Sequence, residues 1–396
     1  MSDSSRVLLR FVILSGLTFA QVSLPRVQAT IAQTTIAQPP TQRSSTPSTL
    51  PKAVQVVAKL QELPGNLTVT PSGRIIVSMH QFTSPPYRVM EWLPQRQQLV
   101  PFPNATWASG RKADSNKGLD EVLGIQSDLQ GIVWMLDNGG RTGAPPQLVG
   151  WNTKTNRLDR ILPIPKPLAS DRTFLNDLAI DSDRQIAYIA ETAMGNAAPA
   201  ILVVHLKTGH TRRLLSGHPS VSPEAVELAV AGQPIQIKQP NGQLIKPRIA
   251  INPIALDGKN EWLYYGPMSG KRLYRIRTAD LRNEALTPEQ LARAVQDYAA
   301  KPNCDGISID QAGNIYISDF ERDAIGVIRP DRTYQTIAQS PELSWIDAFS
   351  FGPDGYLYTV ANQLHRTAAL NAGQSTLQPP YLILRLKPLA PGIVGR

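Results

Sequence analysis

Carboxylate and carboxamide side chains recur at one position of a repeated pattern along this chain. Each copy of the pattern begins a short apolar strand, and in five of the six copies the residue at that start is Asn or Asp. The six residues, in chain order, are Asn66, Leu123, Asn176, Asn252, Asp305 and Asp347. Oxygen-rich side chains of this kind bind hard cations such as Ca²⁺, and they also hydrogen-bond polyhydroxylated or amine-bearing small molecules.

This chemistry requires side chains that are far apart in sequence to converge, and the repeat that could bring them together is clearest in residues 303–328, NCDGISIDQAGNIYISDFERDAIGVI. Polar and apolar residues alternate through 305–309, a turn follows at 310–314, and a second alternating strand begins at Ile315. Period-two alternation on both sides of a Gly/Asn turn predicts an antiparallel hairpin. We expect Gly313 to adopt a positive φ in this turn.

Related hairpins occur six times along the chain. They cover residues 66–77, 123–136, 176–189, 252–265, 305–317 and 347–358. Their spacing of about 40 to 75 residues is typical of four-stranded propeller blades with loop insertions, and one such unit cannot bury both of its faces alone. The sequence therefore predicts an all-β fold, a six-bladed β-propeller with short helical insertions, spanning residues 52–396.

In a propeller, the first strand of each blade lines the central channel. We therefore predict that the side chains at the strand starts bind a ligand there, together with Asp177, which adjoins Asn176. The alternative at any one position is a turn cap, because Asn and Asp often bond their own backbone. Carboxylates that face one channel repel each other unless a cation, a water cluster or a cationic ligand lies between them. Asp120 and Glu121 are candidates to fill the gap at Leu123.

The N-terminal residues predict an exported protein. Residues 1–29 resemble a signal peptide, with Arg6 before and Arg10 within an apolar run at 7–20 and a small-residue cleavage site that ends at Ala29. A membrane anchor is the alternative, but the run is shorter than the ~20 residues needed to span a bilayer. Residues 30–51 are rich in Thr, Gln, Ser and Pro and predict a disordered linker. We expect a secreted or periplasmic protein without a membrane span.

The composition argues against a nucleic-acid partner and excludes an intramolecular disulfide. The 396 residues include 42% hydrophobic residues, enough for one large core shared by the blades. The net charge is +9, but the basic residues are scattered and lack interleaved aromatic residues, so we predict no nucleic-acid partner. Cys304 is the only cysteine, which excludes an intramolecular disulfide, and we interpret it as a buried thiol.

Several other segments carry structural predictions. Residues 53–60 and 379–386 both resemble strands, and we expect them to share the last blade and close the ring. A capping box at Thr287 predicts a helix that runs on past Leu291 toward Tyr298, and Ser222-Pro223-Glu224 predicts a shorter helix that ends at Gly232. Aromatic residues recur in the second strands and are interpreted as filling the interfaces between blades; they are Trp134, Trp262, Tyr316 and Tyr358.

Two histidines follow the second strands of the first and last blades. His80 and His365 are expected to be neighbours at the channel mouth once the ring closes. Two histidines without a third ligand make a weak case for zinc.

Three segments resemble the yellow/major royal jelly protein family. They are residues 251–276 (INPIALDGKNEWLYYGPMSGKRLYRI), 304–320 (CDGISIDQAGNIYISDF) and 345–365 (WIDAFSFGPDGYLYTVANQLH). The resemblance implies a secreted six-bladed propeller. Members of the family include dopachrome-converting enzymes, binders of small amines, and proteins with nutritive or signalling roles, so the resemblance leaves open whether this chain is an enzyme.

A more distant resemblance is to the gluconolactonase/regucalcin family of metal-dependent lactone hydrolases. Asn252 and Asp305 match two metal-binding positions of that family, and Asn176 matches a substrate-side or metal-side Asn. The family has a Glu ligand where this chain has Gly65-Asn66, which weakens the case for a divalent site.

Three functional hypotheses remain. The first is that the channel binds a small polar or amine-containing ligand without turnover. The second is a lactone hydrolase in which Asn176, Asn252 and Asp305 hold Ca²⁺ or another divalent cation and Asp347 is the general base. The third is a purely structural or protein-binding propeller.

Overall fold

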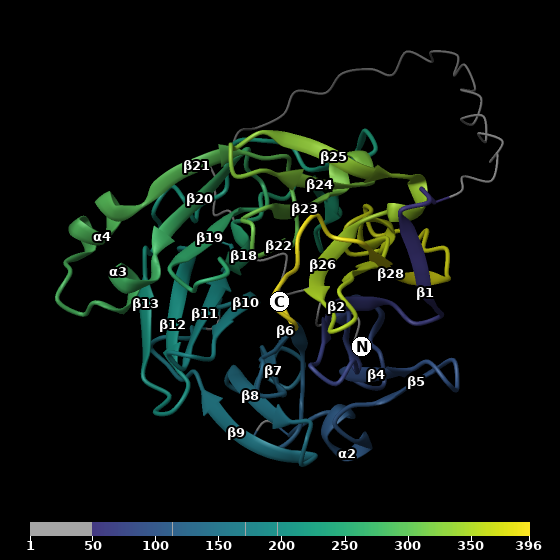
Figure 1. Cartoon of the computed structure of the whole chain (residues 1–396), viewed down its shortest axis with the longest axis horizontal. Helices are drawn as coiled ribbons and strands as arrows, with labels where there is room; N and C mark the ends of the chain where they lie inside the picture. The colour runs from purple at the N-terminus through teal and green to yellow at the C-terminus, as the bar shows by residue number, and fades with distance from the viewer. Residues whose placement is uncertain (1–49, 113, 171, 196) are drawn as a thin grey trace, which may run out of the picture.

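Six four-stranded antiparallel sheets surround one axis in the computed structural model of this chain (Figure 1). The structure describes residues 50–396 except 113, 171 and 196. The chain is a six-bladed β-propeller with a few short helices, so the predicted fold class is confirmed. The predicted signal peptide and nearly all of the predicted linker lie outside the described residues.

The blades follow one another in chain order, each beginning with its innermost strand. Blade 1 contains β2 (Pro64–Val69), β3 (Ile75–Met79), β4 (Val89–Leu93) and β5 (Gln98–Pro101). Blade 2 contains β6 (Val122–Ser127), β7 (Ile132–Asp137), β8 (Gln147–Asn152) and β9 (Arg157–Pro163). Blade 3 contains β10 (Leu175–Asp181), β11 (Ile186–Glu191), β12 (Ala200–His205) and β13 (Thr211–Leu214).

The second half of the ring repeats this order and then returns to the start of the chain. Blade 4 contains β18 (Ile251–Leu256), β19 (Trp262–Pro267), β20 (Arg272–Arg277) and β21 (Gln296–Ala300). Blade 5 contains β22 (Ile307–Ile309), β23 (Ile315–Asp319), β24 (Ala324–Ile328) and β25 (Tyr334–Gln339). Blade 6 contains β26 (Ile346–Phe351), β27 (Leu357–Ala361), β28 (Tyr381–Leu386) and, outermost, β1 (Val54–Leu60).

The two ends of the propeller domain close the ring. β1 pairs antiparallel with β28, from Val54 opposite Leu386 to Leu60 opposite Tyr381. The predicted sharing of the last blade is therefore confirmed. This pairing stabilises closure because it replaces an exposed strand edge with backbone hydrogen bonds between distant parts of the chain.

Aromatic residues of the second strands fill three of the blade interfaces, as predicted. Trp134, Tyr316 and Tyr358 are buried, and each donates a hydrogen bond to an Asp in the turn before its strand, at 2.8 to 3.0 Å. Trp262 differs, because it is only partly buried and the guanidinium groups of Arg275 and Arg277 lie 4.1 and 4.5 Å from its ring centroid. In the tight turns, Gly313 has the expected positive φ of 84°.

The helices are shorter than the sequence predicts. α4 (Pro288–Ala294) has the predicted capping box at Thr287, but it ends at Ala294, because the following residues pair with β20 as β21. The helix predicted after Ser222 is wrong: Ala229–Val230 forms β14, which pairs with β15 (Gln233–Pro234). The remaining helices are single turns or little more. They are α2 (Ala105–Ala108), α3 (Thr278–Arg282), η1 (Gln81–Thr83), η2 (Phe320–Arg322), η3 (Pro341–Leu343) and η4 (Leu364–Arg366).

Residues 222–249, which we call the crossing segment, connect blade 3 to blade 4 and reach across to blade 6. The segment contains the β14–β15 hairpin and a second hairpin, β16 (Ile237–Lys238) with β17 (Leu244–Ile245). Gln236 exchanges backbone hydrogen bonds with Leu370 and Ala372, at 3.1 and 2.8 Å. The buried residues Leu228, Val230, Ile235 and Ile237 belong to the same apolar cluster as Phe320, Trp345 and Leu364. The segment is therefore part of the core and not a loose loop.

The C-terminal residues run into the centre of the ring (Figure 1). The carbonyl of Gly395 accepts a hydrogen bond of 3.0 Å from Thr68, and the carbonyl of Arg396 accepts one of 2.7 Å from the Phe351 amide. The Arg396 guanidinium donates to the Ile180 carbonyl and to the Asn260 side chain, at 3.1 and 2.6 Å. The partners of the tail lie in the last residues of the inner strands or just after them. The tail therefore occupies the channel at the end opposite the starts of these strands.

Two further predictions concern single features. Cys304 is fully buried, and burial raises the pKa of its thiol to about 11, which confirms the interpretation as a buried thiol. Across the part of the chain that the structure describes, no helix is both long enough and apolar enough to cross a bilayer.

Candidate functional site

A cavity of about 420 Å³ opens at the end of the channel where the inner strands begin. All six residues predicted to bind a ligand line it: Asn66, Asn176, Asp177, Asn252, Asp305 and Asp347. Blade 2 contributes Leu123 and Gly124 instead. Asp120 does not fill this gap, since one of its carboxylate oxygens accepts hydrogen bonds from the backbone of Arg141 and Thr142 at 2.9 Å. The ring of acids and amides therefore has one apolar gap.

β-bulges direct these side chains toward the axis. In five inner strands the pairing register shifts across the ring position, between Pro64/Leu67, Val122/Ile125, Leu175/Leu178, Ile251/Ile254 and Ile346/Phe349. In blade 5 the ring position precedes the strand, and the amides of Asp305 and Gly306 both donate to the Ser318 hydroxyl at 2.9 Å. A bulge removes residues from the ladder and re-aims their side chains, so the repeat places ligand-facing groups at equivalent points of each blade.

Glycines let neighbouring inner strands touch at the level of the ring. A Cβ atom on Gly306 would lie 2.1 Å from the Asp347 carbonyl oxygen, and one on Gly124 would lie 2.7 Å from that of Asn176. Both distances are far below van der Waals contact, so only glycine fits at these points. This close approach packs adjacent inner strands tightly against each other around the cavity.

Each carboxylate of the ring accepts a hydrogen bond from a neighbouring side chain. Asn252 donates to Oδ1 of Asp305, and Asn66 donates to Oδ1 of Asp177 at 3.2 Å. Trp345 Nε1 donates to Oδ2 of Asp305 at 2.6 Å, and Asn362 Nδ2 donates to Oδ2 of Asp347 at 2.8 Å. The sequence reasoning missed both Trp345 and Asn362. The sequence did carry a signal for them, because both lie in the segment 345–365. Trp345 comes just before the strand that contains Asp347, and Asn362 comes just after the strand that pairs with it.

The electrostatics of the ring favour a cation. Burial raises the pKa of Asp177 to about 7 and that of Asp347 to about 6. Burial, and then repulsion by Asp347, raises the pKa of Asp305 well above its ordinary value. None of the three carboxylates forms an ion pair with a basic side chain among the described residues. No basic side chain therefore stabilises the charged forms of these carboxyls, and a positive group bound beside them would do so.

An aromatic stack orients the ring carboxylate of blade 5. The indole of Trp345 lies between Phe320, at 4.6 Å between ring centroids, and His365, at 6.1 Å, with all three rings nearly parallel. Trp345 is 1% exposed, so its rotamer is determined by packing. Since the indole N–H is thereby fixed in space, the Asp305 carboxylate that accepts its hydrogen bond is fixed as well.

His80 and Gln81 contribute polar groups to the cavity wall. Nδ1 of His80 accepts the Phe82 amide at 3.3 Å, and burial lowers the pKa of His80 to about 3. The imidazole is therefore neutral and carries its hydrogen on Nε2. Gln81 is 3% exposed, and no group in the described part of the chain bonds its Oε1. A buried acceptor without a partner is costly, so this atom is available to a ligand N–H.

The predicted meeting of the two histidines is not observed. His80 lines the cavity and contacts Phe82, whereas His365 stacks on Trp345 at 6.1 Å between ring centroids, and the two imidazole rings do not contact each other. Within the described ranges, no three His, Cys, Asp or Glu side chains are grouped so that they could hold a metal ion. The predicted set of Asn176, Asn252 and Asp305 relies on two amides, so this finding does not test it. The set remains a prediction.

Apolar residues form the remaining walls of the cavity. They include Phe82, Phe174, Ile249, Met268, Trp345 and Leu370. A cavity of this size, with mostly apolar walls and a few convergent polar groups, is typical of small-molecule sites. The apolar walls would bury the body of a ligand, and the ring would orient its polar end.

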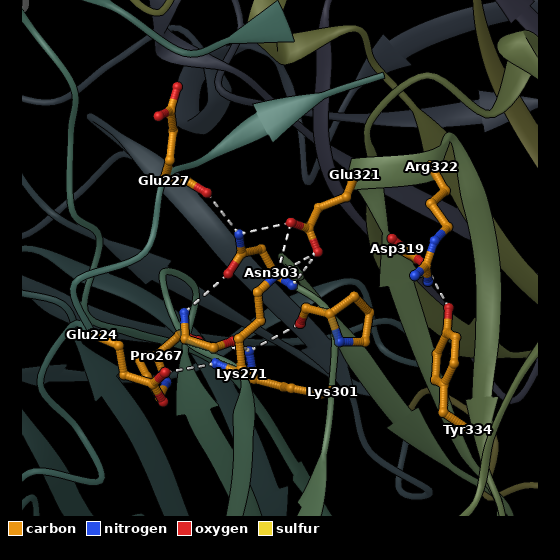
Figure 2. Close-up of polar contacts among 12 residues, drawn as sticks. Glu224, Glu227, Pro267, Lys271, Lys301, Asn303, Asp319, Glu321, Arg322 and Tyr334 are labelled. Carbon is orange, nitrogen blue, oxygen red and sulfur yellow. Dashed lines mark hydrogen bonds and ion pairs between the residues drawn. The ribbon is translucent and has the colours of Figure 1, made fainter. Parts of the chain in front are cut away.

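The crossing segment forms one wall and is anchored to blades 4 and 5 (Figure 2). The Asn303 amide donates to the backbone carbonyl of Glu227 and to the Glu321 carboxylate, both at 3.0 Å, as Figure 2 shows. Lys271 Nζ also bonds both oxygens of Glu321 at 2.7 Å, and its backbone amide donates to the Glu224 carboxylate at 3.1 Å. This wall is therefore held in place by the same network that joins blades 4 and 5.

The sequence of the chain is similar to that of one protein family. Residues 122–390 match the family model described as Major royal jelly protein. Two proteins of Apis mellifera are similar: Major royal jelly protein 8 is 23% identical over 194 residues, which are 46% of this chain and 42% of that protein. Major royal jelly protein 1 is 21% identical over 263 residues, which are 62% of this chain and 57% of that protein. The chain thus spans about half the length of these relatives.

Comparison with solved structures supports the architecture. A gluconolactonase from Xanthomonas campestris superimposes with a TM-score of 0.52 and 11% sequence identity, over 87% of this chain and 96% of that one. At this level of identity the likeness concerns the fold alone.

Proposed function

The chain belongs to the major royal jelly protein family over residues 122–390, and from that premise we propose that it is a secreted propeller whose channel cavity binds a small polar molecule that carries a protonated amine. The observation that carries this proposal is the arrangement of Asp177, Asp305 and Asp347 around one cavity without a basic partner among the described residues.

An ammonium group suits this arrangement for a physical reason. Desolvation raises the pKa of each carboxyl, and mutual repulsion adds to the effect at Asp177 and Asp305. A bound cation would relieve that repulsion and supply hydrogen-bond donors to the acceptor lone pairs that the protein leaves free. A neutral polyol would supply the hydrogen bonds but not the charge.

The polar groups on blade 1 fit the same ligand. The unpartnered Oε1 of Gln81 accepts an N–H, and the neutral His80 donates through Nε2. The apolar walls around Phe82, Phe174 and Trp345 suit a ligand with an aromatic or aliphatic body.

A second candidate is lactone hydrolysis, and one feature of the site favours it. Asp347 lines the cavity with a pKa raised to about 6, which suits a general base near neutral pH. Asn176, Asn252 and Asp305 offer the hard oxygen donors that Ca²⁺ prefers, and a divalent ion held by them would polarise a lactone carbonyl. Against it, only one of these three ligands is charged, and Gly65-Asn66 replaces the Glu expected in the hydrolases. We therefore rank this function second.

Calorimetric titration of the purified protein distinguishes these functions. Phenethylamine is the amine probe, and glucose, glucono-1,5-lactone and Ca²⁺ are the competing probes. We expect phenethylamine to bind and Asp177→Asn to weaken it about tenfold, because hydrogen bonds to charged groups contribute ~1.5–3 kcal/mol. The control Asp331→Asn, in an exposed turn of blade 5, should leave the affinity unchanged.

Other results would point away from amine binding. Equal affinities for glucose and phenethylamine would show that charge does not select the ligand. Binding of Ca²⁺ that Asp305→Asn abolishes, together with release of acid from the lactone, would establish the hydrolase.

The proposal of secretion rests on the sequence of residues 1–29. When the full chain is produced in a host that recognises its signal, the exported protein should begin at Thr30. N-terminal sequencing of the exported and retained fractions tests this, and an exported protein that retains residues 1–29 would contradict it.

A further inference from the structure

We infer that the ligand of the channel cavity is a zwitterion, whose ammonium group lies at the ring carboxylates and whose acid group is bound by Arg248 of the crossing segment. This inference rests on the proposed function, because it assigns the second pole of a ligand whose first pole is the amine. It makes Arg248 the residue that distinguishes an amino acid from the simple amine of the same shape.

The cavity has two poles of opposite charge. Asp177, Asp305 and Asp347 line it from blades 3, 5 and 6, while Lys246 and Arg248 line it from the crossing segment. Among the described residues, no ion pair within 4.0 Å joins Arg248 or Lys246 to these carboxylates, so the opposite charges of the cavity do not neutralise each other directly. A ligand that spans them would carry opposite charges at its two ends.

Arg248 is the cation that is free to bind. Lys246 already pairs with the Glu227 carboxylate at 2.9 Å. The Arg248 guanidinium, in contrast, forms no hydrogen bond, ion pair or ring contact with any part of the chain that the structure describes, although its residue lines the cavity. A planar guanidinium with five donors binds a carboxylate through two parallel hydrogen bonds, which an ammonium cannot do.

The backbone that carries Arg248 is held firmly. Ile249, the next residue, donates its amide to the Ser269 hydroxyl at 2.8 Å and accepts the Ser269 amide at 2.9 Å. Pro247, the preceding residue, restricts the backbone further. The start of the crossing segment is fixed through Glu224 and Glu227 to Lys271 and Asn303 (Figure 2). The guanidinium therefore projects from an ordered wall.

The orphan amide of the cavity wall gives independent support for an occupant. Gln81 is 3% exposed and its Oε1 has no partner in the described part of the chain. An ammonium or a neighbouring N–H of the ligand would satisfy this acceptor. A purely anionic ligand bound by Arg248 would not satisfy it, and it would also face the ring carboxylates.

Matched pairs of compounds test the inference directly. L-Phenylalanine and phenethylamine differ only in the carboxylate, as do L-tryptophan and tryptamine. In calorimetric titrations we expect the native protein to bind each amino acid about tenfold more tightly than its amine, the size of one charge-assisted interaction. Arg248→Ala should weaken binding of each amino acid about tenfold and so remove this preference, and Arg248→Lys should restore part of it.

The matched control is Arg293→Ala, an exposed arginine on α4, which should leave both affinities unchanged. If the native protein binds the amine and the amino acid equally well, or if Arg248→Ala weakens both alike, the zwitterion inference is overturned while amine binding stands. If the native protein binds none of the four compounds, both the inference and the proposed function are overturned.

Discussion

The indole N–H of Trp345 donates a 2.6 Å hydrogen bond to the carboxylate of Asp305, across the boundary between blades 5 and 6. Asp305 belongs to the ring that lines the cavity, and Trp345 is held in a stack between Phe320 and His365. The orientation of one ligand-facing carboxylate therefore depends on the packing of the next blade.

Replacing Trp345 with Phe tests this dependence. The substitution keeps an aromatic ring in the stack but removes the donor, so a buried carboxylate oxygen loses its hydrogen bond. We expect the free energy of unfolding to fall by about 1–3 kcal/mol and the affinity for phenethylamine to fall about tenfold. Chemical denaturation and calorimetry measure the two effects.

Trp92→Phe is the matched control, because the Trp92 indole nitrogen is buried and has no hydrogen-bond partner in the described part of the chain. It loses the same atoms without losing a bond, so its ligand affinity should be unchanged. Equal effects of the two substitutions on ligand affinity would show that the bond to Asp305 does not matter.

Ligand affinity should depend on pH in a defined direction. Burial raises the pKa of Asp347 to about 6 and that of Asp177 to about 7, so both carboxyls are protonated below these values and charged above them. An ammonium ligand keeps its own charge throughout this range. We therefore expect its affinity to increase as pH rises from 5 to 8, with protons released on binding.

Calorimetric titrations in two buffers of different ionisation enthalpy measure this proton release. Asp177→Asn should reduce it and shift the remaining pH dependence toward the lower pKa of Asp347. Affinity that is constant from pH 5 to 8 would contradict a binding role for these carboxyls. The same pKa shifts make the unliganded fold bind more protons than the unfolded chain, so its stability should decrease across this window as pH rises.

Gly306 should tolerate no side chain. A Cβ atom there would lie 2.1 Å from the Asp347 carbonyl oxygen, so Gly306→Ala must push two inner strands apart. We expect a loss of about 2–3 kcal/mol in the free energy of unfolding, the upper part of the range for overpacking, and weaker ligand binding. Thermal and chemical denaturation measure the loss.

Gly258→Ala is the control for this substitution. A Cβ atom at Gly258 would meet its nearest neighbour, Gln311, at an ordinary 3.5 Å, so the change in stability should stay within about 0.5 kcal/mol. A Gly306→Ala protein as stable as the Gly258→Ala protein would show that the inner strands are not in close contact.

Lys301 should stabilise the junction of blades 4 and 5. Its ammonium group is buried and donates to the carbonyls of Pro267 and Gly270 at 2.8 and 2.7 Å (Figure 2). Lys301→Met keeps the length of the side chain but leaves these carbonyls without the donor. We expect destabilisation of about 1–3 kcal/mol in denaturant titrations. Lys259→Met, at an exposed turn, should have no effect, and equal stability of both variants would contradict the role of Lys301.

Local patterns in the sequence predicted much of the fold. Alternation and turn residues specify hairpins within about 15 residues, and their repetition requires stacked blades. Because the blades are related by rotation about one axis, the residues at the same phase of each repeat had to meet, and all six of the predicted ligand-binding residues do line one cavity.

Where local signals competed with long-range pairing, the predictions were wrong. The helix at Thr287 has its predicted cap, but residues 296–300 pair with β20 because a strand edge was available to them. The segment after Ser222 forms hairpins that pack against Phe320 and Trp345, which come about 100 residues later in the chain. A pattern within a short stretch of sequence cannot indicate a packing partner that lies so far along the chain.

The amino-acid sequence alone determined which chemical groups face the axis, because type and phase within a repeat are properties of the chain itself. Only the tertiary structure decided how those groups act: which amide bonds which carboxylate, the indole that orients Asp305, and the arginine that the crossing segment presents opposite the acids. These relationships depend on distances between blades and on the loss of solvent around each group, and both arise only when the ring closes.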